Sequence, residues 1–149
     1  MTFLRKILYL KRNVYIYLCK HKGLKLGSKC RIMKGVSFGS EPYLIEIKNE
    51  VTISFDVSFV THDGGTWVFR DLDPSVNKFG TILVKERAFI GARSIILPNV
   101  IIGERSVIGA GSIVTKNVPD DEVWAGVPAR FVMTREEYYL KLKSKAHEK

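Results

Sequence analysis

Aliphatic residues recur along this chain every six positions. The longest run begins at residue 84, and the same period occurs in two earlier blocks, 26–38 and 47–59. The twelve in-register positions are Leu26, Ile32, Phe38, Ile47, Ile53, Phe59, Val84, Ile90, Ile96, Ile102, Ile108 and Val114. Six residues of an α-helix turn through about 600°, so an apolar stripe with this spacing would drift around the helix axis. The period therefore predicts short strands rather than a helix.

A second set of small or β-branched residues follows four positions after the aliphatic residues of the longest run. Its members are Ala88, Ser94, Val100, Ser106, Ser112 and Val118. We interpret each hexad as one short strand and one corner, so that three hexads close one triangular coil. Glycine follows Ile90 and Ile102, where we expect a corner dihedral that a Cβ would resist. Stacked coils bury the apolar face that no single coil buries alone, so we predict an all-β solenoid over residues 24–133.

Two interruptions break the repeat. The first covers residues 40–46 and contains Pro42. The second covers residues 63–83 and is rich in Gly, Asp, Pro and Asn, which is typical of loops. Because a loop of that length inside a compact domain usually has a function, we expect the longer insertion to serve the active site.

The repeat ends after Val118. The segment 125–128, Ala-Gly-Val-Pro, is expected to break any helix or strand. Thr134 and Glu137 then form the pattern of a capping box, which predicts a C-terminal helix within residues 134–149.

Positive charge is concentrated at the N-terminus. The 149 residues carry a formal net charge of +9, and no acidic residue precedes Glu41. The basic residues of this part are Arg5, Lys6, Lys11, Arg12, Lys20, Lys22, Lys25, Lys29, Arg31 and Lys34. The remainder of the chain is nearly balanced, so any argument from charge concerns the N-terminal quarter and above all the basic segment 1–23.

Residues 3–22 mix this charge with apolar side chains and predict an amphipathic helix. No apolar run reaches the about 18 residues that a membrane-spanning helix needs, and Lys11 and Arg12 interrupt any signal-peptide core. We favour a helix that caps the solenoid; the alternative is a helix that lies on an anionic membrane surface. Cys19 and Cys30 have no disulfide-framework or zinc-site spacing, so we expect a cytoplasmic protein, with membrane-peripheral attachment as the alternative.

The stretch from Ile90 to Arg130 reads IGARSIILPNVIIGERSVIGAGSIVTKNVPDDEVWAGVPAR. The words IGAGSIVTK and AGVPAR are highly specific, and the stretch resembles the hexapeptide-repeat acyltransferases. Within that family it is similar to the galactoside, maltose and xenobiotic acetyltransferases and to bacterial sugar or polysaccharide O-acetyltransferases. The resemblance covers roughly residues 24–133 and implies a left-handed parallel β-helix, an exception to the usual right-handed crossover. It also implies a homotrimer that uses acetyl-CoA as acyl donor in clefts between subunits.

His62 is the only histidine inside the predicted solenoid, and it stands just before the long loop. In the resembled family a histidine at this junction is the general base, and imidazole titrates in the range needed to take a proton from a hydroxyl acceptor. The resemblance places an orienting amide one coil earlier, and here we expect Glu50 in that role. Asp56 and Asp63 are alternatives, and all three carboxylates also suit solvated corners.

The resemblance also assigns residues to acetyl-CoA. The expected cofactor-binding residues are Phe89, Ala92, Ala110, Thr115, Lys116 and Arg130. Phe89 stands where tryptophan is common in the family, and it would flank the thiol arm together with Ala92. The ammonium of Lys116 is a point charge, and the guanidinium of Arg130 can donate two parallel hydrogen bonds, so both could bind the phosphates of the cofactor. Lys116 could equally be a charged side chain in solvent.

The long loop contains candidate acceptor-binding residues. We expect Asp63, Trp67 and Arg70 to bind the acceptor, with Trp67 stacking on the apolar face of a sugar and the loop reaching a neighbouring subunit. The alternative is that the loop is a clasp between subunits.

The sequence thus predicts direct acetyl transfer to a hydroxyl, or an amine, of a small-molecule or glycan acceptor such as a surface-polysaccharide precursor. Two alternatives stay open: a non-catalytic β-helix scaffold, and an acetyltransferase for an acceptor such as serine or an antibiotic. A zinc enzyme would need three histidine ligands, so no metal is expected. The basic segment has no base-reading motif, so no nucleic-acid partner is expected.

Overall fold

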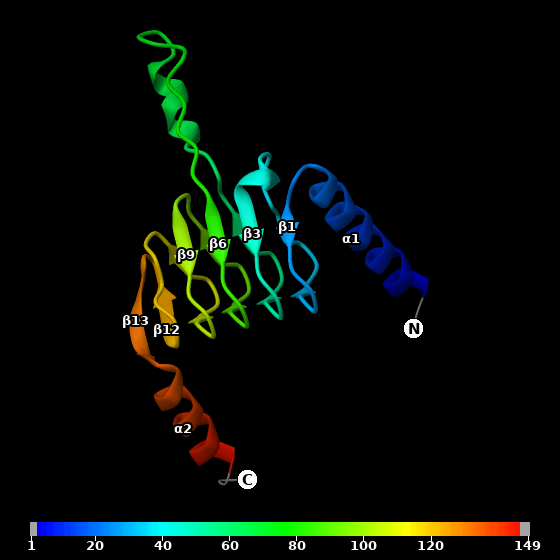
Figure 1. Ribbon diagram of the computed structural model, residues 1–149, viewed down its shortest axis with the longest axis vertical. Coiled ribbons are helices and arrows are strands. Elements are labelled where there is room, and N and C mark those ends of the chain that lie inside the picture. The colour runs from blue at the N-terminus through cyan, green and yellow to red at the C-terminus, as the bar shows by residue number, and fades with distance from the viewer. Residues whose placement is uncertain (1–2, 147–149) are drawn as a thin grey trace.

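The computed structural model describes residues 3–146, so the first two and last three residues of the predicted terminal segments lie outside it. Its main body is a solenoid of short strands, and Figure 1 shows the coils side by side. Helix α1 (Phe3–His21) precedes the first coil, and helix α2 (Arg135–Ala146) follows the last strand. A long arm, residues 63–80, rises from the middle of the solenoid, away from both helices (Figure 1).

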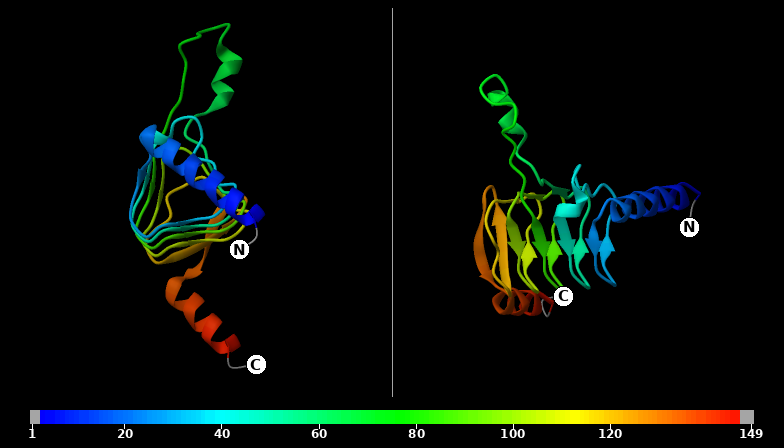
Figure 2. Two further views of the ribbon diagram at one scale, coloured as in Figure 1. Left: turned by 90° about the vertical axis from the view of Figure 1, so that its right-hand side faces the viewer. Right: turned by 45° about the horizontal axis from the view of Figure 1, so that its top comes forward.

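The strands form three sheets, one on each side of a triangle that is visible end on in Figure 2. Sheet A contains β1 (Lys25–Leu26), β3 (Ile45–Ile47), β6 (Ile82–Val84) and β9 (Val100–Ile102). Sheet B contains β2 (Arg31–Ile32), β4 (Thr52–Ile53), β7 (Phe89–Ile90), β10 (Val107–Ile108), β12 (Glu122–Gly126) and β13 (Ala129–Thr134). Sheet C contains β5 (Ser58–Phe59), β8 (Ile95–Ile96) and β11 (Ile113–Val114). Neighbouring coils pair in parallel throughout.

Each pair of sheets meets at an edge made of turns. Edge AB comprises residues 27–30, 48–51, 85–88 and 103–106. Edge BC comprises residues 33–36, 54–57, 91–94 and 109–112. Edge CA comprises residues 39–44, 60–81, 97–99 and 115–117. Both interruptions of the repeat lie on edge CA, where they contain the short helices η1 (Pro42–Leu44) and η2 (Gly64–Phe69).

The predicted inward positions fill the interior of the coil. Of the twelve aliphatic or aromatic positions, eleven are buried, and Leu26 packs against them partly buried. All six positions of the second set are buried as well. The hydroxyls of Ser94, Ser106 and Ser112 each donate to the carbonyl oxygen three residues earlier, at 2.6–2.8 Å, so these polar groups are satisfied in the core. Both predicted sets are confirmed as core.

Two of the glycines that follow inward residues, Gly91 and Gly103, serve a different purpose from the predicted one. A Cβ on Gly91 would lie 2.5 Å from the backbone nitrogen of Ala110, and one on Gly103 would lie 2.4 Å from the carbonyl carbon of Pro119. The left-handed backbone occurs instead at corner residues such as Arg87, with φ 58°. The prediction of a special corner dihedral is therefore wrong at Gly91 and Gly103, where glycine is needed because the next coil passes too close. Gly39, which follows Phe38, does have a left-handed backbone, with φ 65°.

Helix α1 projects obliquely outward from the N-terminal end of the coil, and its C-terminal half packs against the first coil (Figures 1 and 2). Tyr15 stacks on Phe38 with ring centroids 6.1 Å apart, and the Phe38 backbone N–H donates to the Tyr15 hydroxyl at 2.9 Å. Cys19 is buried, and Ile16 packs against the core beside it. This side of α1 therefore covers the first coil. Among the described residues, no helix is long and apolar enough to cross a membrane.

Strands β12 and β13 pair antiparallel and extend sheet B beyond the last coil. The segment 125–128 lies at their turn, so the prediction that it breaks any strand is wrong in part: strand pairing continues to Gly126. Helix α2 begins with the predicted capping box. The Thr134 backbone N–H donates to Glu137 Oε2 at 2.7 Å, and the Glu137 N–H donates to Thr134 Oγ1 at 3.2 Å.

Candidate active site

His62 lies on edge CA, where the chain leaves the coil and enters the arm. An antiparallel bridge joins His62 to Phe79 on the returning strand of the arm, and the Gly80 N–H donates to the carbonyl oxygen of Thr61 at 2.8 Å. The His62 side chain is 44% exposed. It borders a cleft of about 420 Å³ that Lys78, Thr115 and other residues of edge CA also line. The backbone of His62 is thus fixed by hydrogen bonds to the arm, and its imidazole is accessible to a reactant from the cleft.

A carboxylate from the preceding coil holds the ring of His62. Nδ1 of His62 lies 2.9 Å from Oε2 of Glu41, and the Thr61 hydroxyl donates to the same oxygen at 2.7 Å. The hydrogen bond from Thr61, followed by the contact with His62, holds the pKa of Glu41 below its usual range. An ionised carboxylate only accepts, so Nδ1 carries the proton in this contact and Nε2 is the basic nitrogen.

The prediction that Glu50 orients His62 is wrong. Glu50 is exposed on edge AB with φ 60°, whereas His62 lies on edge CA. Asp56 lies on edge BC, also exposed. Asp63 is adjacent to His62, but its Oδ1 accepts from the Gly65 N–H at 3.0 Å and so caps η2. The carboxylate partner of the imidazole is instead Glu41, within the first interruption of the repeat.

The register between the first two coils explains why Glu41 reaches His62. Ser37 pairs with Ser58, and this spacing continues to the hydrogen-bonded pair Glu41 and His62, which are 21 residues apart. The same spacing separates the aliphatic residues of the first two blocks, for example Phe38 and Phe59. That spacing is visible in the sequence and agrees with position 41, whereas a fixed coil of 18 residues does not lead to it; the structure is needed to show that the same spacing continues through the turn.

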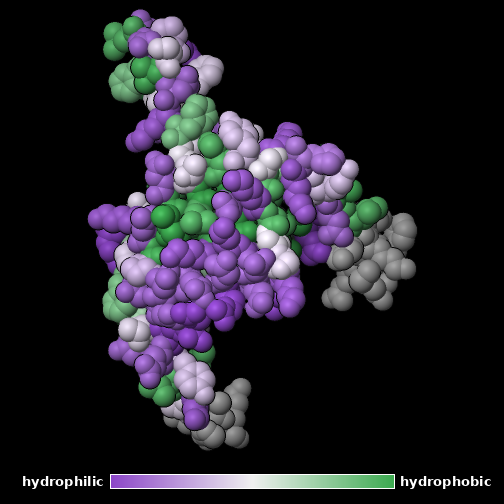
Figure 3. All heavy atoms as spheres, in the orientation of Figure 1, coloured by the Kyte–Doolittle hydropathy of each residue, from purple (hydrophilic) through white to green (hydrophobic). Residues whose placement is uncertain are grey.

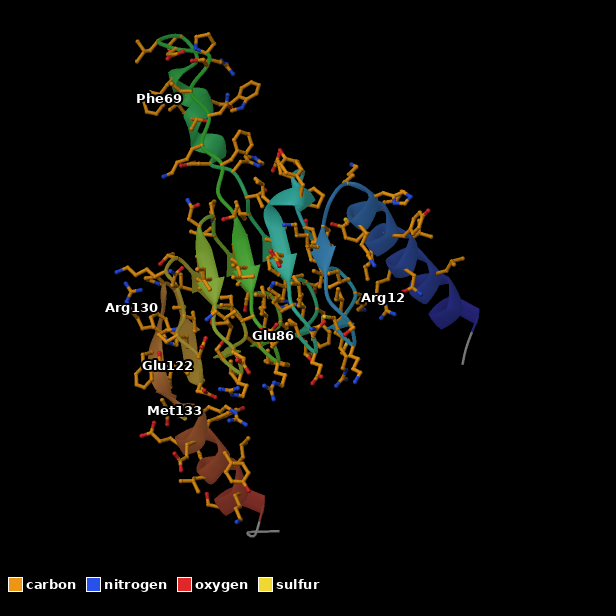
Figure 4. All side chains as sticks on the ribbon, viewed as in Figure 1. Arg12, Phe69, Glu86, Glu122, Arg130 and Met133 are labelled. Carbon is orange, nitrogen blue, oxygen red and sulfur yellow. The ribbon has the colours of Figure 1, made fainter. Side chains whose placement is uncertain are left out.

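The predicted acceptor-binding residues Trp67 and Arg70 lie on the arm rather than beside His62. The Arg70 guanidinium carbon lies 5.5 Å from the centroid of the Trp67 ring, and both line a separate cleft of about 350 Å³ on the arm. The arm points away from the coil, as the position of Phe69 on η2 shows (Figure 4). Within one chain, the structure therefore does not bring Trp67 and Arg70 together with His62.

The residues predicted to bind the outer part of acetyl-CoA lie in two separate parts of the chain. Thr115 and Lys116 are exposed on edge CA, and Thr115 lines the same cleft as His62. Arg130 lies on β13 at the far end of the solenoid, where its Nη1 donates to the carbonyl oxygen of Ala129 at 2.9 Å (Figure 4). Of these residues, Thr115 is the one that lines the same cleft as the imidazole.

The remaining predicted cofactor residues lie on sheet B and edge BC. Phe89 is 40% exposed on β7, between Thr52 and Val107 of the neighbouring strands. Ala92 and Ala110 occupy equivalent turns of successive coils, joined by the hydrogen bond from the Gly111 N–H to the Ala92 carbonyl oxygen at 2.8 Å. These residues lie on a different edge from His62 in the same chain. Within residues 3–146, no group of three or more His, Cys, Asp or Glu side chains could hold a metal ion.

Comparisons with known proteins agree with this architecture. Residues 81–116 match the family model described as bacterial transferase hexapeptide (six repeats). Protein CapG of Staphylococcus aureus is 47% identical over 135 residues, which cover 89% of this chain and 78% of CapG. The coil repeat and the similarity to CapG over most of both chains thus point to the same family.

Solved structures add enzymes with the same fold. The polySia-specific acetyltransferase NeuO aligns with a TM-score of 0.62 and 27% identity, covering 73% of this chain and 50% of NeuO. A mutant of AntD, an N-acyltransferase from Bacillus cereus in complex with dTDP-4-amino-4,6-dideoxyglucose and coenzyme A, aligns with a TM-score of 0.61 and 26% identity, covering 83% of this chain and 73% of AntD. With its triangular parallel coils, this chain is a left-handed β-helix and belongs to the hexapeptide-repeat acyltransferases.

Proposed function

We propose that this protein transfers an acetyl group from acetyl-CoA to a hydroxyl group of a sugar or surface-polysaccharide precursor, with His62 as the general base. The observation that carries the proposal is the imidazole of His62, held through Nδ1 by Glu41 and exposed beside an open cleft. NeuO, an acetyltransferase specific for polySia, and AntD, in complex with a nucleotide sugar and coenzyme A, support a glycan-type acceptor and acetyl-CoA as donor.

In this mechanism Nε2 of His62 removes the hydroxyl proton as the acceptor oxygen attacks the thioester carbonyl carbon. The new C–O bond forms, the C–S bond breaks, and the proton passes from the imidazolium to the leaving thiolate. Glu41 stabilises the imidazolium that forms and keeps the ring oriented through both proton transfers. Backbone N–H groups stabilise the oxyanion of the tetrahedral intermediate. An amine acceptor would follow the same course, with N-acetylation as the outcome.

A homotrimer fits the distribution of the predicted cofactor residues. Thr115 and Lys116 lie on edge CA, whereas Ala92 and Ala110 lie on edge BC. A cleft between two copies that contact through these edges would gather both sets around one elongated cofactor. Lys116 and Arg130 would supply charge for its phosphates. The mass of the purified protein tests the assembly, and a monomer that retains full activity would contradict it.

The arm would complete the acceptor site of a neighbouring subunit. It exposes Trp67, Val68 and Leu72 by 66–78%, more apolar surface than an isolated loop ordinarily presents. In this arrangement Trp67 stacks on the apolar face of a sugar and Arg70 contacts a polar or anionic group, with Asp63 fixing the start of the arm. The Trp67→Ala variant should raise the KM for the acceptor while the trimer mass stays unchanged. A dissociated trimer would instead identify the arm as a clasp.

The decisive experiment is acetyl transfer by the purified full chain to a panel of nucleotide sugars, glycans, serine and aminoglycosides. We expect transfer to a sugar hydroxyl, detected by release of the CoA thiol and by product mass, and an ester that alkali hydrolyses. A product formed with serine or an aminoglycoside alone would overturn the acceptor class. No thermal stabilisation by acetyl-CoA, together with no transfer, would identify a non-catalytic β-helix instead.

A further inference from the structure

We propose that helix α1 and the first coil dock on an anionic bilayer surface. The side of the helix that does not pack on the coil makes the contact with the bilayer. The proposal concerns where the enzyme works and does not depend on the acceptor. Capping the coil and contacting a membrane are compatible, because the structure gives α1 two apolar sides.

The two apolar sides of α1 face opposite directions. Tyr15, Ile16 and Cys19 pack against the coil. Leu10, Val14, Tyr17 and Leu18 instead form an uncovered stripe, with exposed fractions of 63%, 49%, 58% and 51%. Their spacing of four, three and one residues places them on one side of the helix, turned about half a revolution from the coil-facing side. A helix that only caps a solenoid would expose polar residues on this side.

The end of the molecule that carries the stripe is rich in basic residues. Lys20 and Lys22 are exposed at the end of α1, and Lys29, Arg31 and Lys34 are exposed on the first coil. No acidic residue precedes Glu41 in the sequence. This end of the molecule therefore combines apolar side chains with positive charge. In Figure 3 a small apolar (green) surface shows on the right, between the hydrophilic (purple) coil and the atoms drawn in grey.

An anionic bilayer complements both properties. An amphipathic helix in the interface buries its apolar side at the boundary of headgroups and acyl chains, and lysine and arginine side chains are attracted to the anionic headgroups. Tyrosine is enriched at that depth, which suits Tyr17. In a threefold trimer the three basic ends would lie at the same end of the assembly and could face one bilayer together.

Docking in this orientation leaves the catalytic edge accessible. Helix α1 projects from the N-terminal end of the coil, and the arm extends sideways from the solenoid (Figure 2). Glu41 lies in the connection between the first and second coils, so the imidazole it holds stands near the docked end rather than the far end. An acceptor at the membrane surface would therefore be presented close to the site.

The test is sedimentation of the full chain with vesicles of phosphatidylcholine containing phosphatidylglycerol, and with vesicles of phosphatidylcholine alone. We expect binding about tenfold stronger to the anionic vesicles, weakening as salt is added. A triple variant, Leu10→Ser with Val14→Ser and Leu18→Ser, should lose about tenfold in vesicle binding. It should keep the native melting temperature, because all three side chains are exposed.

A matched control uses exposed apolar residues of the other terminal helix. Leu140 and Leu142 of α2 are 56% and 52% exposed, and the double variant Leu140→Ser with Leu142→Ser should bind vesicles like the native chain. Equal binding of the native chain to both vesicle types would overturn the proposal, as would unchanged binding of the triple variant. A fall in the solution mass of the triple variant would assign the stripe to contact between copies. None of these readouts involves acetyl transfer, so their results do not test the proposed function, which has its own experiment.

Discussion

The regular coils and edge CA of this molecule follow different rules. Between the third and fourth coils every strand keeps one spacing: Ile82 pairs with Val100 and Phe89 with Val107, eighteen residues apart in each case. Between the second and third coils Ile45 pairs with Ile82, because the arm is inserted on edge CA. The core tolerates this insertion, since the residues before and after it re-enter the same inward register.

The regular coils stabilise the fold, whereas the candidate catalytic residues lie on the irregular edge. The buried aliphatic residues hold the three sheets together wherever the repeat is regular. His62, Glu41 and Thr61 all lie on the irregular edge, where the chain departs from the repeat. Substitutions in the regular coils should therefore lower the free energy of unfolding, whereas substitutions on edge CA should lower activity. The following variants test that division.

The largest expected effect is on turnover. His62→Ala should lower kcat by at least about 100-fold, the usual contribution of a general base, and should leave the melting temperature almost unchanged because the side chain is 44% exposed. His21→Ala, at an exposed histidine of α1, is the control and should keep native kcat. Near-native turnover by His62→Ala would remove the histidine from the mechanism.

A core substitution should show the opposite behaviour. Ile102 is fully buried in the regular coils, so Ile102→Ala should lower the free energy of unfolding by about 3 kcal/mol, measured by denaturant titration. The same assay on Leu72→Ala, at a side chain of the arm that is 78% exposed, should change it by less than about 0.5 kcal/mol. Comparable losses in both variants would mean that the arm belongs to the cooperative core.

The carboxylate partner of His62 should have an intermediate effect. Glu41→Gln removes a charged hydrogen bond worth roughly 1.5 kcal/mol, so kcat should fall roughly tenfold while the KM for acetyl-CoA stays native. Glu41→Asp should restore part of the loss, which a purely structural role would not predict. Glu50→Gln, on edge AB, is the matched control and should have native kinetics. Equal losses in Glu41→Gln and Glu50→Gln would contradict the assignment of the edges.

The smallest expected effect is on the pH dependence of stability. The hydrogen bond from Thr61 and the contact with His62 lower the pKa of Glu41 in the folded state. A lowered folded pKa stabilises the fold above the ordinary glutamate value of about 4.3, and this stabilisation is lost as pH falls through the folded value. The difference in unfolding free energy between the native chain and Glu41→Gln should therefore shrink as the pH falls below about 4.3. The same curve for Thr61→Val should show a smaller acid-dependent part, and identical curves would refute this cause.

The sequence by itself determined the coil, the position of His62 at the base of the arm and the start of α2. Each follows from a local pattern: six-residue spacing of aliphatic residues, loop residues directly after Asp63, and the pair Thr134 and Glu137. Burial and capping act over a few residues, so the order of residue types is enough to predict them.

Only the tertiary structure decided which side chains of different coils meet. Glu41 rather than Glu50 faces His62, since the short insertion between the first and second coils sets which residues stack across edge CA. The stacking of coils also explains why Gly91 is needed for the close approach of the next coil rather than for a corner dihedral. The tertiary structure likewise places Trp67 on the arm, away from the imidazole of its own chain. Stacking neighbours are set by the number of residues in every intervening turn, a sum over distant segments that no local pattern contains.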